Sequence, residues 1–138
     1  MENRIVLDTN CLLMAISARN RYHRVWQSFL EGSYTLCFST EILEEYEEVL
    51  ARNINPHVAQ YVISALINRQ NTCFVNVYFK FGLITADPDD NKFVDCAIAA
   101  NARFIVTEDK HFEALKDVDF PRIDVISIDA FIRQLHND

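Results

Sequence analysis

Short apolar runs alternate with longer amphipathic stretches along the chain. The short runs are rich in Ile, Val and Phe, as is typical of strands buried on both faces. The predicted strands cover residues 4–7, 34–38, 73–77, 103–107 and 123–127. Between them, apolar residues recur at the spacing of one helix face. This alternation predicts an α/β fold, a three-layer α/β/α sandwich with a mainly parallel sheet of about five strands.

Residues suited to helix ends bracket the helical stretches. Ser39 or Thr40 can cap one helix, and Gly32 ends the helix before it. Asn55 is a suitable cap for the next helix, with Pro56 in its first turn. The predicted helices cover residues 11–17, 22–30, 40–52, 56–69, 87–101, 111–115 and 129–135.

Length and composition indicate how many domains the chain forms and what kind of core it has. A chain of 138 residues with 50% hydrophobic content fits one domain, residues 1–138, with a substantial core. Its apolar runs are far shorter than a membrane span, so we expect a cytoplasmic protein without membrane association. Four widely spaced cysteines with apolar neighbours predict buried, reduced thiols rather than disulfides.

The net charge of −7 would ordinarily disfavour a nucleic-acid partner, because phosphate binding depends on Lys and Arg. Acidic residues gathered in a metal site would contribute to this charge. A bound divalent ion would reverse its local sign and attract phosphate. The charge therefore leaves open a metal-dependent enzyme that acts on phosphodiesters.

Two predicted strands end in acidic residues. Asp8 follows the first strand, and Asp109 follows the strand at 103–107. Carboxylates just beyond buried parallel strands are well placed for chemistry. Both could instead cap the helices that follow. Asn10 could cap a helix or hold Asp8, and the Thr107 hydroxyl could support the same site.

The glutamates at 41, 44, 45, 47 and 48 crowd one predicted helix, where a solvated face is the simplest interpretation. Projection at 100° per residue places Glu45 and Glu47 on the two borders of the apolar stripe and the other glutamates farther out. Periodicity cannot choose between these two.

A third acidic motif opens the helix predicted at 87–101. Asp87 suits a cap, and Asp89 suits the positive end of the helix dipole. Asp90, by contrast, projects into the middle of the apolar stripe, where an isolated carboxylate is costly and a cation would remove the cost. Asp95 projects about 140° away on the same 3.6-residue geometry, which leaves it a peripheral or second-metal role.

The ordered motifs resemble those of PIN domains over nearly the whole chain. The matching segments are Asp8-Thr9-Asn10, the stretch 39–46 with Glu45, the stretch 87–93 with Asp90, and Thr107-Glu108-Asp109. The chain is most similar to the small bacterial branch of toxin components, the VapC-type ribonucleases. The resemblance implies that Asp8, Glu45, Asp90 and Asp109 are the catalytic quartet, and it favours Glu45 over Glu47.

The resemblance also implies roles around the quartet. Asp8, Asp90 and Asp109 would hold one or two Mg²⁺ or Mn²⁺ ions, which suit hard oxygen ligands. Asn10, Thr107 and Ser39 match supporting polar positions, although Ser39 could equally serve only as a cap. Glu108 is a departure, because close relatives often have Gly there, and a charged side chain could alter the loop or the metal affinity.

The expected activity is metal-assisted hydrolysis of RNA. Phosphate-binding charge could come from five basic side chains, two of which adjoin motif acids, and Tyr22 or Trp26 could stack on bases. The five are Arg19, Arg21, Arg24, Lys92 and Lys110. A solvated turn before an amphipathic helix with Trp26 in the core explains the arginines equally well.

The expected partners are RNA and a cognate antitoxin protein, and a homodimer is a further assembly to test. One alternative is a PIN-like module that binds RNA or a protein without catalysis. Four retained acids argue against it, because binding alone does not need them. A phosphatase that begins at Asp8 is a weaker alternative, because Asn10 stands where such an enzyme would need a second acid.

Overall fold

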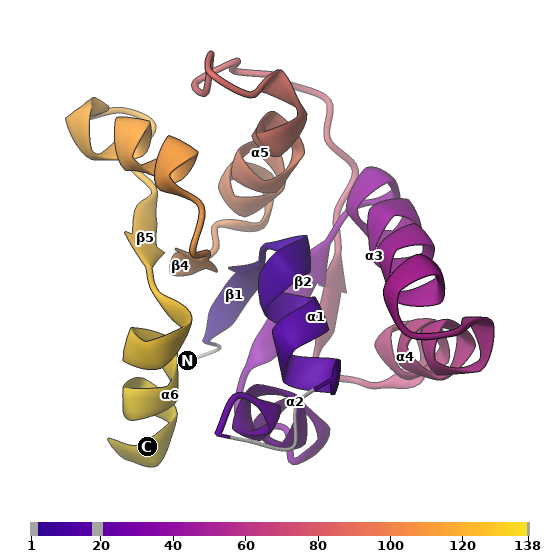
Figure 1. Cartoon of the computed structure of the whole chain (residues 1–138). Helices are drawn as coiled ribbons and strands as arrows, with labels where there is room; N and C mark the ends of the chain where they lie inside the picture. Colours follow the sequence, from indigo (N-terminus) through magenta and orange to yellow (C-terminus); the bar gives the residue numbers. More distant parts are fainter. Residues whose placement is uncertain (1–2, 18–20, 138) are drawn as a thin grey trace.

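The computed structural model describes residues 3–17 and 21–137 and contains a five-stranded, all-parallel sheet (Figure 1). The strands are β1 (Arg4–Leu7), β2 (Thr35–Phe38), β3 (Thr72–Phe74), β4 (Phe104–Val106) and β5 (Asp124–Ile126). Their order across the sheet is β3-β2-β1-β4-β5. The predicted α/β class is confirmed.

Each connection between consecutive strands contains at least one helix. The α-helices are α1 (Thr9–Ser17), α2 (His23–Leu30), α3 (Thr40–Asn53), α4 (Pro56–Asn68), α5 (Asn91–Ala100) and α6 (Ile128–Asn137). Two further segments are 3₁₀-helices, η1 (Pro88–Asp90) and η2 (Lys110–Asp117). No helix in the described part of the chain is both long and apolar enough to cross a membrane.

The strand order reverses direction once. The chain moves outward from β1 to β3, returns to β4 on the other side of β1, and ends at β5. Because parallel crossovers are right-handed, this reversal places the β1–β3 connections on one face and those around α5 on the other. The switch point of the strand order therefore lies between β1 and β4, and sheets of this kind bind ligands beyond the carboxyl ends of the strands at that point.

Local chemistry accounts for several helix ends. Ser39 caps α3 by accepting a hydrogen bond from the Ile42 amide at 3.4 Å, and Asn55 caps α4 through the Val58 amide at 2.8 Å. Gly32, with φ +83°, ends α2 with the paired backbone bonds of a Schellman motif. These are the positions at which the sequence predicts helix boundaries.

The core is continuous between the sheet and its helices. Ile5, Val6 and Leu36 in the strands are fully buried, as are Phe93 on α5 and Phe131 on α6. The cysteines form no disulfide. Three of them are buried and Cys73 is half-buried, close to the prediction of buried reduced thiols.

Candidate active site

The carboxyl ends of β1 and β4 bring two acidic segments together. The Asp8 amide donates to the Val106 carbonyl at 3.0 Å, which extends the pairing of the two strands by one residue. Thr107 follows β4 directly, and Asp109 comes two residues later. Both segments therefore lie at the carboxyl ends of β1 and β4, where the strand order reverses.

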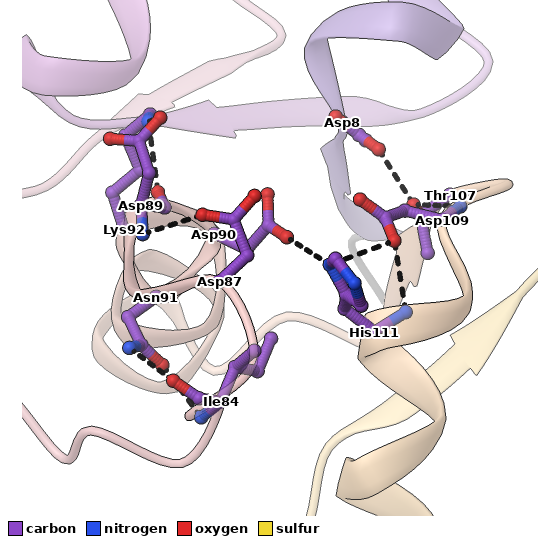
Figure 2. A network of polar contacts seen from close by, with 10 residues as sticks. All are labelled: Asp8, Ile84, Asp87, Asp89, Asp90, Asn91, Lys92, Thr107, Asp109 and His111. Atoms are coloured by element: carbon purple, nitrogen blue, oxygen red, sulfur yellow. Dashed lines mark hydrogen bonds and ion pairs between the residues drawn. The ribbon is translucent and has the colours of Figure 1, made fainter.

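Thr107 connects the two segments through its hydroxyl, as Figure 2 shows. The hydroxyl donates to Asp8 Oδ2 at 2.6 Å and accepts from the Asp109 amide at 3.0 Å. Thr107 and Asp8 are both buried, so this geometry is held within the protein interior. The short bond fixes the orientation of the Asp8 carboxylate.

Burial raises the pKa of Asp8 above its ordinary value, and the negative charges of Asp109 and Glu45 raise it further. Hydrogen bonds from Thr107 and from the backbone of Asn10 act in the opposite direction. Asn10 thus supports Asp8 through its amide, while its side chain is exposed. The electrostatic coupling also shows that three of the four predicted carboxylates lie close together.

Asp90 approaches Asp109 and His111 from the start of α5. Its Oδ2 lies 3.5 Å from His111 Nδ1, and Asp109 Oδ1 lies 3.4 Å from the same nitrogen. Figure 2 shows His111 between the two carboxylates. Asp87, Asp90 and His111 each place one potential ligand atom within 4.8 Å of the others, an arrangement that could hold a metal ion.

The environment of Asp90 favours its neutral form or a cation partner. Burial raises the pKa of Asp90 to about 6, with further contributions from Asp109, Asp87 and Asp8, while His111 lowers it. Its Oδ2 is shut off from solvent and has no hydrogen-bond partner among the described residues. The contact with His111 at 3.5 Å is too long for a hydrogen bond, and a buried carboxylate oxygen without one is costly unless a cation completes its surroundings.

Glu45 reaches the cluster from α3. The Thr9 hydroxyl donates to Glu45 Oε2, and Lys92 Nζ lies 2.8 Å from Oε1. The neighbouring Tyr46 is fully buried and donates from its hydroxyl to the Leu7 carbonyl at 2.5 Å, which ties α3 to the end of β1. Glu47 is exposed. The structure therefore separates the two glutamates that periodicity left equivalent.

The family model described as the PIN domain matches residues 4–111, which contain all four of these carboxylates. The chain belongs to the PIN domain family. The match ends inside η2 and leaves β5 and α6 outside it.

Solved structures share the fold of this PIN domain. One is VapBC2 from Rickettsia felis, bound to a DNA fragment from its promoter, with 18% identity over 90% of this chain and 98% of that chain, and a TM-score of 0.59. Another is DNA-bound VapBC from Salmonella typhimurium, with 20% identity over 93% of this chain and 99% of that chain, and a TM-score of 0.61. No curated protein matches the chain.

The motif around Asp90 differs from the single helix expected over 87–101. Asp87 accepts from the Asp89 amide at 3.2 Å and caps a 3₁₀ turn, and regular α5 begins only at Asn91. Asp90 therefore lies at the cap position of α5 rather than within it. Asp95 points elsewhere. Only 4% exposed, it accepts from the Phe81 amide at 3.1 Å, and it is apart from the contacts that join the quartet.

The predicted arginine surface is not beside the acids. Arg21 and Arg24 follow the end of α1, whereas Asp8 precedes its start, and nine helical residues span about 13 Å. Figure 1 accordingly shows α2 and the start of α5 at opposite ends of the molecule. Arg21 pairs with Asp129 at 3.1 Å. Arg19 lies outside the described residues.

The part of that prediction that concerns Trp26 is wrong. Trp26 is 4% exposed and packs against Phe29, with ring centroids 5.2 Å apart, so it belongs to the core. Arg24 is half-buried, and its Nε has no hydrogen-bond partner within the described part of the chain. The alternative interpretation, a solvated turn before an amphipathic helix with Trp26 in the core, is correct for this ring.

The two lysines beside motif acids differ from one another. Lys92 is nearly buried, with 8% of its side chain exposed, and its ammonium bridges Glu45 and Asp89. Lys110 is exposed. Glu108 is also exposed and has an ordinary negative φ, so the glutamate at this position imposes no strained backbone. Ser39 caps α3, as described above.

Sequence reasoning missed three contributors to the site. His111 and Asp87 flank the carboxylates, and Thr9 binds Glu45. His111 had a recognisable signal, because Asp109 caps η2 and so turns the residue two positions later back toward the cluster. Thr9 and Asp87 had none beyond their capping character, since their partners come from the tertiary fold.

Proposed function

We propose that this PIN domain is a metal-dependent ribonuclease. One observation carries the proposal: at the switch point of the sheet, Thr107 links Asp8 to the Asp109 segment, and His111 lies within 3.5 Å of both Asp109 and Asp90. Clustered carboxylates repel one another, and a divalent cation removes that repulsion. Oxygen-rich clusters of this kind suit Mg²⁺ or Mn²⁺, as one or two ions.

The residues present fit such an ion. Asp90 Oδ2, which accepts no hydrogen bond among the described residues, offers a ligand atom, and Asp8 and Asp109 approach from β1 and β4. When bound, the ion supplies a Lewis acid that polarises the scissile phosphate and lowers the pKa of an attacking water. These three carboxylates would hold it; among the described residues, the group whose ligand atoms already lie within 4.8 Å of one another is Asp87, Asp90 and His111.

The remaining side chains set positions and charge. Thr107 orients Asp8, while Thr9 and Lys92 orient Glu45. Held in this way, Glu45 can accept a proton from the attacking water. Lys92 is occupied by two carboxylates, so the exposed Lys110 is the better candidate for direct phosphate contact. In this proposal the side chains mainly position the reacting groups and form no covalent bond with the substrate.

Cleavage of labelled RNA tests the proposal. Purified protein is incubated with single-stranded and structured RNA in Mg²⁺ or Mn²⁺, beside Asp8→Asn, Glu45→Gln and the matched control Glu47→Gln. We expect the first two variants to lose at least 100-fold in rate, because each removes a charge at the site. The control should retain wild-type activity, because Glu47 is exposed.

Two results would contradict the proposal. Equal activity in the Glu45→Gln and Glu47→Gln variants would remove Glu45 from the site. Absence of cleavage by the wild type with either ion, together with retained RNA binding, would favour the alternative of a binding module without catalysis.

We infer further that the protein acts as the toxin of a toxin–antitoxin pair. The fold is that of the VapBC proteins above, which were solved with DNA, and the motifs resemble VapC-type toxins. A cognate antitoxin is the expected partner, and a small open reading frame beside the gene would encode it. Co-expression should suppress RNA cleavage by the wild type, and unchanged cleavage in the co-purified complex would contradict this inference.

A further inference from the structure

A pocket of about 350 Å³ lies on the side of the candidate active site that Lys92 and Asp89 form. The N-terminal end of α3, the segment after β3 and the start of α5 form its walls, with Ser39, Tyr78, Lys80 and Asp95 among the lining residues. Figure 1 shows that segment running past the start of α3 to the start of α5. The volume lies at the lower end of the range for small-ligand pockets, about 300–1,000 Å³.

The pocket shares a wall with the candidate active site. Lys92 and Asp89 line it, and the Lys92 ammonium lies 3.0 Å from Asp89 Oδ2 and 2.8 Å from Glu45 Oε1. Figure 2 shows Lys92 and Asp89 on the same side as Asp90. A substrate whose phosphate lay at the carboxylates would therefore place a neighbouring group in this pocket.

We call residues 75–86 the strap. The strap has no helix or strand of its own, yet two buried or half-buried side chains of α5 hold it in place. Asp95 accepts from the Phe81 amide at 3.1 Å, and Asn91 bonds both the amide and the carbonyl of Ile84 at 2.8 Å. Anchoring at two points keeps the strap over the pocket rather than free in solution.

The strap carries aromatic rings into solvent. Tyr78 is 89% exposed and Phe79 75% exposed, and the rings of Phe79 and Phe81 lie with centroids 5.6 Å apart. Exposed rings on an anchored segment are suited to stacking, which is the usual way proteins hold unpaired bases of single-stranded nucleic acid. Tyr78 is the ring that lines the pocket itself.

The charges of the pocket select the part of a nucleotide that fits. Glu41, Asp89 and Asp95 line it, against Lys80 and Lys92, and the Lys92 ammonium is already shared by two carboxylates. A phosphate would meet net repulsion here. A neutral base would not, and its N–H groups could donate to the buried Asp95 carboxylate.

Resting on the proposed ribonuclease function, we propose that this pocket holds one unpaired base of the RNA next to the scissile phosphate. Tyr78 stacks on the base and Asp95 accepts a hydrogen bond from it. The dimensions of the pocket and its shared wall with the carboxylates favour a nucleotide over a protein segment as the occupant.

Binding of short labelled single-stranded RNA, followed by fluorescence anisotropy with Ca²⁺ in place of Mg²⁺, tests this pocket. An abasic position is moved along the oligonucleotide. We expect one abasic position to weaken binding by the wild type about tenfold, since stacking is worth about 1–3 kcal/mol per base. Tyr78→Ala should bind the intact oligonucleotide about tenfold more weakly and show no further loss at that abasic position.

Two controls keep the outcome clear. Tyr78→Phe retains the ring and should bind like the wild type. Phe120→Ala removes a ring that is 91% exposed outside the pocket and should change nothing. The proposal that this pocket holds a base is overturned if Tyr78→Ala binds RNA as tightly as the wild type, or if no abasic position weakens binding. Either result counts against the pocket even if the protein cleaves RNA. A base-dependent loss in a protein that cleaves no RNA would instead contradict the proposed function and uphold the pocket.

Discussion

Among single residues, Asp90 lies in surroundings that disfavour its charged form. Its carboxylate has a pKa raised to about 6 by burial and by neighbouring acids. We predict that Asp90→Asn stabilises the protein at pH 7.5 in the presence of a chelator by on the order of 1 kcal/mol, because the substitution removes repulsion that solvent only partly screens. Thermal unfolding should show a Tm about 3 °C higher.

The raised pKa of Asp90 predicts that the stability of the protein depends on pH. A folded pKa above the ordinary value of 3.8 means that the folded state binds its proton more tightly, so stability should fall as pH rises from about 4 to about 6. Unfolding of the chelated wild type across this range, compared with Asp90→Asn, measures the contribution. If both proteins have the same pH profile, Asp90 is not in the environment described.

Thr107 is the residue whose hydroxyl aligns Asp8. Replacement by Val keeps the shape and removes the bond to Asp8 Oδ2, whereas Ser keeps a hydroxyl. We predict that Thr107→Val weakens Mn²⁺ binding about tenfold, in line with the effect of removing an outer partner of a metal ligand. Thr107→Ser should remain near the wild type. Equal affinities in the two variants, measured by titration, would show that the hydroxyl does not position Asp8.

Between elements, the contact of α3 with β1 decides where Glu45 lies. The buried Tyr46 hydroxyl holds the Leu7 carbonyl one residue before Asp8. We predict that Tyr46→Phe lowers the free energy of unfolding by about 1–2 kcal/mol and reduces RNA cleavage, because α3 loses its attachment to the strand end. Tyr61→Phe, at a ring that is 56% exposed, is the matched control. A loss of stability without a loss of activity would show that Glu45 is positioned by other contacts.

Elements also show where sequence reasoning worked. The strands and most helices follow from apolar periodicity and from caps such as Asn55, which act locally. The 3₁₀ turn at 88–90 could not be predicted in this way, because a 3₁₀ turn and the first turn of an α-helix have the same capping residues. The predicted strand at 73–77 is observed only as Thr72–Phe74, since β2 offers just four residues for pairing and the chain then leaves the sheet edge.

For the molecule as a whole, the fold class was predictable because a parallel sheet needs apolar strands separated by helices. The positions of Asp8 and Asp109 at strand ends followed from the same pattern, whereas the adjacency of these two strands is seen only in the structure. The choice of Glu45 over Glu47 did not, because it depends on the packing of α3 against β1. The distance between the arginine turn and the acids was not predictable from the motifs, because it depends on the direction in which α1 carries the chain.

The whole fold should respond to a divalent ion. Ligands that bind only the folded state stabilise it by mass action, about 2.7 kcal/mol at 100 times the dissociation constant. We predict that saturating Mn²⁺ raises the Tm of the wild type by several degrees and leaves that of Asp8→Asn nearly unchanged. Equal increases in both proteins would indicate binding elsewhere on the surface.

The most direct test of the carboxylate site is calorimetric titration of Mn²⁺ into wild type, Asp90→Asn and Glu47→Gln at neutral pH. We predict that the wild type and Glu47→Gln bind with the same affinity and number of ions. Asp90→Asn should lose at least one ion or weaken binding by more than tenfold. Binding by Asp90→Asn that equals the wild type in affinity and number would contradict the claim that these carboxylates hold the metal.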